Sequence, residues 1–277
     1  MDRFEKAAET LMGVKDTGHS KGFQILVRQI GESKTKHEED RIIKKEATFL
    51  KETIGSPSIT SNQMKEFLVR LVYCEMLGHD VSWGYIHAVK LTQSLNVAEK
   101  RIGYLASTLL LHEKHELNML LVNTLQKDLK SANMVEVSTA LIVIGKLIGG
   151  EMAPAVLPLV QEKLVHSKVL VRKKAVLAMQ HFAHIDSSLV SHLENDFRRI
   201  LSDPDPGVME ASLLLFHDLI KEKPLPYKDL VGSFVYILDQ VISRKLPNEF
   251  DYHGVPAPWI QMKLLRILAI LGADDTK

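Results

Sequence analysis

The sequence predicts an all-α protein: an armadillo- or HEAT-like α-solenoid, in which stacked helical hairpins form a right-handed superhelix. Apolar residues recur at steps of three and four, as in Leu117, Leu120, Leu121 and Leu125. This spacing makes a stripe on a helix and not the alternating face of a strand. Short breakers separate such segments, and a small residue returns at a nearly constant interval along the chain.

The breakers divide the first half of the chain into seven helical segments. Gly55-Ser56-Pro57-Ser58 and Gly78-His79-Asp80 interrupt the apolar pattern, because proline fixes φ and glycine favours turns. The predicted helices of this half are residues 22–31, 36–53, 61–77, 83–94, 97–111, 114–130 and 134–148.

The second half follows the same pattern. Its breakers are Gly149-Gly150, the proline-rich segments 203–207 and 223–226, and Gly254 to Pro258. The predicted helices are residues 152–165, 168–183, 187–201, 207–221, 227–243 and 258–271.

A small residue inside alternate helices indicates stacked hairpins. Ala106, Ala140, Ala175 and Ala211 follow one another at intervals of 34, 35 and 36 residues. A repeat of this length holds two helices, and alanine lets neighbouring hairpins approach closely. The alternative is an irregular helical bundle, which gives no reason for a constant interval.

Composition narrows the function classes. Of 277 residues, 45% are hydrophobic, which excludes a disordered chain. The net charge of +1 argues against a large nucleic-acid surface. One cysteine excludes an internal disulfide, and no apolar run reaches about 18 residues. A cytoplasmic protein with peripheral membrane contact is expected.

The expected organisation is a poorly ordered segment, 1–20, followed by a solenoid trunk over residues 21–277. The last helix, Trp259 to Leu271, is apolar over most of its circumference. A solenoid normally ends in a polar cap, so we expect this trunk to be part of a longer solenoid or to pack on a partner.

The sequence contains no convincing motif for catalysis or for metal binding. His112 and His115 lie three apart around one glutamate, which departs from the His-Glu-x-x-His zinc spacing. His181 and His184 share a helix face without a completing ligand set. Cys74 lies in an apolar helix, where a buried structural thiol is expected. We therefore predict no enzyme, no cofactor and no metal; a helical-repeat enzyme acting on nucleic acid is a rival that the net charge disfavours.

Two basic groups stand out. Residues 34–45 mix lysine and arginine with acidic residues, so that face neutralises itself. Arg172, Lys173 and Lys174 are more concentrated, and each could add about 1 kcal/mol of attraction to anionic lipid. They are the lipid-facing candidates, with an ordinary solvated helix face as the alternative.

Several blocks of the sequence carry a family resemblance: residues 70–80, 83–91, 100–105, 122–129, 171–175 and 255–259. In this order they resemble the N-terminal trunk of the large subunits of clathrin-type heterotetrameric adaptor complexes, the adaptin family, from about Phe23 onward. Residues 227–230 and 251–253 point more narrowly to one of its subunit types.

The resemblance implies a vesicle-coat adaptor. Such a complex joins this subunit to a beta-type large, a medium and a small subunit. It binds cytosolic tails of transmembrane cargo at the trans-Golgi network or endosomes, and a GTP-bound Arf-family GTPase recruits it. The alternative is another protein-binding solenoid, such as a nuclear-transport or regulatory scaffold.

Carried over by position, the resemblance selects two surfaces. Ile86, Val89 and Leu120 would contact the GTPase. The small subunit would bind the mostly apolar first helix, through Ile25, Leu26, Val27 and Ile30.

Two departures limit what is carried over. Gly31 stands where dileucine-binding relatives have arginine, which leaves that activity unsupported. Lys65 stands alone where the plasma-membrane relative has a triple lysine, which favours recruitment led by the GTPase.

Overall fold

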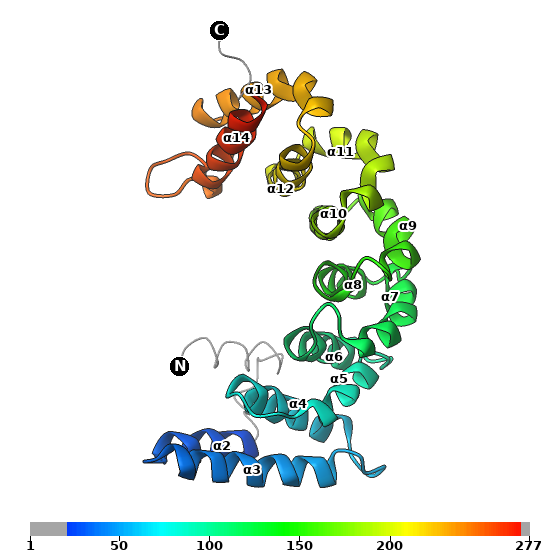
Figure 1. Ribbon diagram of the computed structural model, residues 1–277, viewed down its shortest axis with the longest axis vertical. Helices are drawn as coiled ribbons and strands as arrows, with labels where there is room; N and C mark the ends of the chain where they lie inside the picture. The colour runs from blue at the N-terminus through cyan, green and yellow to red at the C-terminus, as the bar shows by residue number, and fades with distance from the viewer. Residues whose placement is uncertain (1–20, 273–277) are drawn as a thin grey trace. The chain divides into compact units, whose positions relative to one another are not determined.

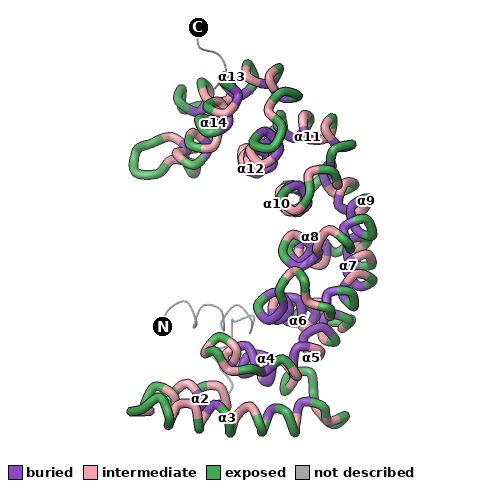
Figure 2. The backbone as a smooth tube through the Cα atoms, in the orientation of Figure 1, coloured by how far each residue is buried: buried purple, intermediate pink, exposed green. Residues whose placement is uncertain are grey.

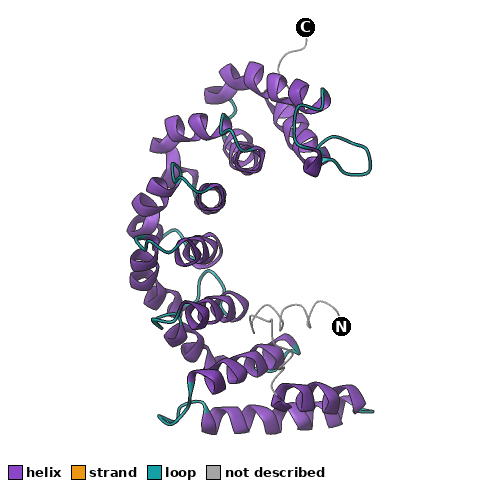
Figure 3. Ribbon diagram, turned by 180° about the vertical axis from the view of Figure 1, so that it is seen from behind, coloured by secondary structure: helices purple, strands orange, loops and turns teal. Residues whose placement is uncertain are grey.

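The computed structural model describes residues 21–272, and they are helical except for short connections (Figures 1 and 3). The segment 1–20, expected to be poorly ordered, lies outside the described residues. In the described part the one β-type pairing is the isolated bridge between Tyr252 and Val255. The chain divides into two compact units, Met1–Val143 and Ile144–Lys277, with the boundary inside helix α8.

In the first unit, helices that follow one another in sequence pack in pairs. Helix α2 lies against α3 and α4, α4 lies against α6, and α5 lies against α6. The elements are α2 (Lys21–Glu32), α3 (Lys36–Thr53), α4 (Ser61–Met76), η1 (Ser82–Gly84), α5 (Tyr85–Leu91), α6 (Val97–Leu110), η2 (Glu116–Leu121), α7 (Val122–Leu129) and α8 (Met134–Leu147).

Polar side chains start these helices where the sequence places them. The hydroxyl of Thr60 accepts from the amide of Gln63 at the start of α4, and the Gln63 side chain accepts from the Thr60 amide. The side chain of Asn96 accepts from the amide of Ala98 at the start of α6. Each bond satisfies an amide that the first helical turn leaves open.

The second unit repeats this arrangement. Helix α10 packs against α9 and α12, and α14 packs against α12 and α13. The elements are α9 (Ala153–Lys163), α10 (Val169–Ile185), η3 (Ser187–Leu193), α11 (Glu194–Leu201), α12 (Pro206–Glu222), η4 (Leu225–Leu230), α13 (Val231–Ile242), η5 (Asn248–Phe250) and α14 (Pro258–Leu271).

The recurring alanines lie in the packed interior, as the repeat predicts. Ala106 and Ala140 in the first unit and Ala175 and Ala211 in the second are all buried. Figure 2 places the buried residues where neighbouring helices meet, with exposed residues on the outer turns and connections. The all-α class and the stacking of hairpins within each unit are therefore confirmed, and the handedness of the superhelix stays a prediction.

Short 3₁₀ segments are the main departure from the predicted helices. Four of the expected helices begin as a 3₁₀ turn before the α-helix proper: η1 precedes α5, η2 precedes α7, η3 precedes α11 and η4 precedes α13. The apolar spacing of three and four residues suits both helix types, so the sequence pattern could not separate them.

Pro258 begins α14 as predicted, with Ala257 held at a φ of 37°. The side chain of Trp259 is exposed and lies beside the ring of Tyr252, with 5.4 Å between ring centroids. The buried face of α14 is formed by Ile260, Leu264 and Ile267.

Candidate partner-binding surfaces

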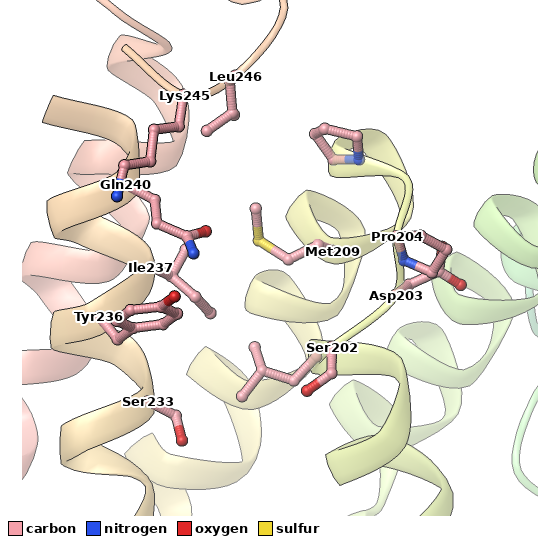
Figure 4. Close-up of a pocket in the computed structure, with 12 residues that line it drawn as sticks. Ser202, Asp203, Pro204, Met209, Ser233, Tyr236, Ile237, Gln240, Lys245 and Leu246 are labelled. Atoms are coloured by element: carbon pink, nitrogen blue, oxygen red, sulfur yellow. The ribbon is translucent and has the colours of Figure 1, made fainter. Parts of the chain in front are cut away.

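An open groove of about 410 Å³ lies in the second unit (Figure 4). One wall is the connection from α11 into α12, and the other is a face of α13. Lys245 and Leu246 lie at one end of the groove. The remaining lining residues are Leu201, Ser202, Asp203, Pro204, Pro206, Met209, Ser233, Tyr236, Ile237 and Gln240.

An ion pair neutralises the carboxylate in this groove. The guanidinium of Arg172 donates two hydrogen bonds to Asp203, at 2.8 and 2.9 Å, and the amide of Asp205 donates a third at 2.9 Å. The hydrogen bonds to Asp203 raise the pKa of Arg172. This ion pair links the start of α10 to the α11–α12 connection.

This pairing removes Arg172 from the lipid-facing candidates. Arg172 also donates to the carbonyl of His166, so it is not an unpaired cation that could meet a lipid head group. Lys173 and Lys174 are half-buried. The contact of Lys173 and Lys174 with lipid stays a prediction.

The proposed GTPase contact divides into buried and exposed residues. Val89 has an exposed fraction of 1%, so it belongs to the core, and the surface position expected of it is wrong. Helix α5 packs closely on α6, and at Gly103 an added Cβ would lie 2.6 Å from the amide nitrogen of Thr92. Ile86 is half-buried, whereas Leu120 is 50% exposed.

Leu120 lies beside a polar pocket of about 240 Å³ in the first unit. The pocket is also lined by Leu95, Lys100, Lys127 and Asp128. Leu95 and the neighbour of Leu120, Met119, are strongly exposed. Two exposed apolar side chains, Leu95 and Met119, therefore lie near Leu120, which is the one exposed residue of the set predicted to bind the GTPase.

The floor of that pocket is a buried ion network. The Lys100 ammonium lies 2.7 Å from Asp128 and 2.6 Å from Glu136, and the Tyr104 hydroxyl donates to Asp128 at 2.7 Å. Ser131 donates to the second oxygen of Glu136. This network ties α6 to α7 and to the start of α8. Two carboxylates surround the one ammonium, which disfavours binding of an added anion there.

The predicted small-subunit residues also separate by burial. Ile25 is 54% exposed, whereas Leu26 is 2% exposed and belongs to the core of the chain. Val27 and Ile30 are half-buried. Helix α2 can therefore present Ile25, with the edges of Val27 and Ile30, but not Leu26.

The residues considered for catalysis have structural roles. Burial raises the pKa of the Cys74 thiol to about 12, which keeps it protonated. His115 accepts a hydrogen bond from the amide of Leu117 and so starts η2, while a ring nitrogen of His181 lies 3.1 Å from the carbonyl of Ile148. Among residues 21–272 no group of three or more potential metal ligands comes together.

None of the described helices is both long and apolar enough to cross a bilayer.

The sequence analysis identified segment 203–207 only as a helix breaker, and so missed the groove that this segment forms with α13. Tyr236, Gln240 and Lys245 lie on that groove. A Pro-Asp-Pro connection that cannot continue a helix is the one signal that could have pointed there.

Stacked helices that leave grooves and apolar side chains on their surface define a helical-repeat scaffold of the kind that binds other proteins. The family model described as "Adaptin N terminal region" matches residues 38–277. The chain belongs to this adaptin family, and the resemblance seen in the sequence is confirmed.

Two curated relatives narrow the likeness to one subunit type. The AP-4 complex subunit epsilon-1 of Homo sapiens is 56% identical over 252 residues, which are 91% of this chain and 22% of that protein. The AP-4 complex subunit epsilon of Arabidopsis thaliana is 54% identical over 258 residues, 93% of this chain and 28% of that protein. The chain thus spans about a quarter of the length of these relatives.

A known structure agrees with the family. A chain in a homology model of the full-length AP-3 complex, in an intermediate open conformation, has a TM-score of 0.61 and 25% sequence identity with this chain. The alignment covers 77% of this chain and 35% of that one.

Proposed function

We propose that this chain is the N-terminal trunk portion of a large subunit in a heterotetrameric vesicle-coat adaptor complex. The observation that carries the proposal is the identity of 54 to 56% with AP-4 epsilon subunits over more than nine-tenths of the chain. In this role the chain is a scaffold and not an enzyme. Its partners are a beta-type large, a medium and a small adaptor subunit.

The complex would sort transmembrane cargo on the cytosolic face of the trans-Golgi network or endosomes. A GTP-bound Arf-family GTPase would recruit it, and several weak contacts would add up through avidity on one scaffold. The ion pair between Arg172 and Asp203 leaves fewer free cations on this face for anionic lipid, which favours recruitment that depends on protein contacts more than on lipid charge.

The GTPase contact fits the apolar surface around Leu120. Leu95, Met119 and Leu120 are exposed leucine and methionine side chains of the first unit, and Ile86 lies on α5, which packs against η2. Exposed apolar residues of this kind suit the apolar part of a switch region. Val89 takes no part, because its side chain is in the core.

The small-subunit contact would use the exposed side of α2. Ile25 is the central residue, and Val27 and Ile30 contribute their accessible atoms. Leu26 is instead buried where α2 packs on the rest of the chain. Leu26→Ala would therefore weaken the packing of α2, whereas Ile25→Asp would weaken binding of the small subunit.

A nucleotide-dependent pull-down tests the GTPase contact. The chain is incubated with Arf-family GTPases locked in the GTP or the GDP form. We expect the GTP form to retain the unaltered chain and not to retain the Leu120→Asp variant. Because the side chain of Leu120 is exposed, the helical CD spectrum of this variant should match that of the unaltered chain. Leu225→Asp is the matched control, because Leu225 is also exposed but lies in the second unit. Retention that ignores the nucleotide, or equal loss in both variants, would contradict the proposed contact.

A further inference from the structure

We propose that the groove between the α11–α12 connection and α13 binds an extended, acidic segment of a partner protein. The proposal concerns the second unit alone, and it does not depend on assembly into an adaptor complex or on the GTPase contact. It rests on three features of the groove: an apolar floor, unpaired polar groups along one wall, and a single unpaired charge.

The floor of the groove is apolar. Leu201 and Met209 come from the α11–α12 side. Ile237 from α13 points toward Met209 (Figure 4). Leu246 closes the end. The volume of about 410 Å³ is in the range of pockets that bury most of a small ligand, so it can enclose apolar side chains of a peptide.

One wall carries polar groups that could bind a peptide backbone. Ser233, Tyr236 and Gln240 lie on one face of α13, at steps of three and four residues. Among the described residues, their side chains make no hydrogen bond with the chain. A carboxamide both donates and accepts, so Gln240 can pair with both groups of one peptide unit. An extended segment leaves those groups open, whereas a helix pairs them internally.

The charges of the groove favour an acidic occupant. Asp203 is neutralised by its two bonds from Arg172. Lys245 lines the groove without an ion pair in the described part of the chain, and its side chain runs along the wall toward Gln240 (Figure 4). An aspartate or glutamate of the partner would find a cation there, whereas a basic segment would meet like charge.

Binding of designed pentapeptides to the whole ¹⁵N-labelled chain tests the proposal. The probes are acetyl-Gly-Leu-Glu-Leu-Gly-amide and the versions with Gln or Lys in place of Glu. We expect amide shifts at residues 202–209 and 233–246. One exposed charge pair adds up to about 1 kcal/mol, or roughly five-fold in affinity, so the Glu peptide should bind up to about five-fold more tightly than the Gln peptide.

Charge reversal supplies the decisive comparison. Lys245→Glu should bind the Lys peptide more tightly than the Glu peptide, which inverts the preference of the unaltered chain. Lys221→Glu is the matched control, because Lys221 is an exposed lysine on α12 outside the groove. It should keep the original preference.

Three results would overturn the proposal. One is the absence of shifts in the groove with every peptide at millimolar concentration. Another is an unchanged peptide preference in Lys245→Glu. The third is loss of binding to phosphatidylserine vesicles in that variant without any effect on peptides, which would assign Lys245 to a membrane contact.

Discussion

The ion network around Lys100 can be tested by removing its cation. The exposed fractions of the two central side chains are 9% for Lys100 and 2% for Asp128. Lys100→Met keeps the apolar stem but deletes the ammonium. Asp128 would then be a buried carboxylate with only the Tyr104 hydroxyl as a donor, and Glu136 would keep only Ser131.

Removing one partner of a buried ion pair costs about 3–5 kcal/mol, because the other charge stays in the interior without compensation. An exposed pair contributes only about 0–1 kcal/mol. Arg199, which is 60% exposed and 2.8 Å from Asp196, supplies such a control. We expect Lys100→Met to lower the free energy of unfolding by about 3–5 kcal/mol at pH 7, and Arg199→Met by less than about 1 kcal/mol.

The contribution of the network should depend on pH. The hydrogen bond from Lys100, with that from Ser131, lowers the pKa of Glu136 below its ordinary 4.5. Burial lowers the pKa of Lys100, but its hydrogen bonds to Asp128 and Glu136 outweigh burial and raise the pKa above 10.5. The ion network therefore stabilises the folded chain at pH values between the pKa of Glu136 and the pKa of Lys100. It is lost as pH falls through the folded pKa of Glu136 or rises through that of Lys100.

Urea denaturation followed by CD at 222 nm measures these differences. The gap between the unaltered chain and Lys100→Met should be large at pH 7 and should shrink below pH 4. If Lys100→Met is no more destabilising than Arg199→Met at pH 7, the network does not hold these helices together and the reasoning is refuted.

Three further predictions concern packing. Gly103→Ala should destabilise the chain by about 1–3 kcal/mol in urea denaturation, because its Cβ would press on backbone atoms. Gly31→Ala is the control: its added Cβ meets nothing within 4 Å, so it should be neutral or stabilising by up to about 1 kcal/mol. If the two variants change the free energy of unfolding equally, the close approach of α5 to α6 at Gly103 is contradicted. Cys74, with its pKa raised to about 12, should not react with Ellman's reagent at pH 8 until the chain is unfolded; fast native labelling would refute its burial. Val89→Asp should lower the melting temperature sharply, because it buries an unpaired charge. An unchanged melting temperature would contradict the burial of Val89.

The helices could be predicted because their information is local. The apolar spacing placed α3 at residues 36–53 and α14 at 258–271 as observed. The spacing of the small residues predicted the buried contacts at Ala106 and Ala175. Both features depend on residues a few positions apart, or on a repeat that is visible along the chain.

The surfaces were harder to predict because they depend on contacts distant in sequence. Arg172 was expected to be an exposed cation, but its partner Asp203 lies 31 residues away. Val89 has the spacing of an accessible strip on α5, but α5 packs against α6 and η2, and Val89 is buried. No periodicity within one helix reveals which neighbour will cover a given face.

The most direct test of the proposed function is the set of proteins that accompanies the chain at native abundance. The chain is tagged at its own locus, purified gently and quantified by mass spectrometry with its partners. The proposal predicts a beta-type large, a medium and a small adaptor subunit in amounts equal to the chain. Purification of the chain alone, or in equal amounts with proteins of another kind, would contradict it.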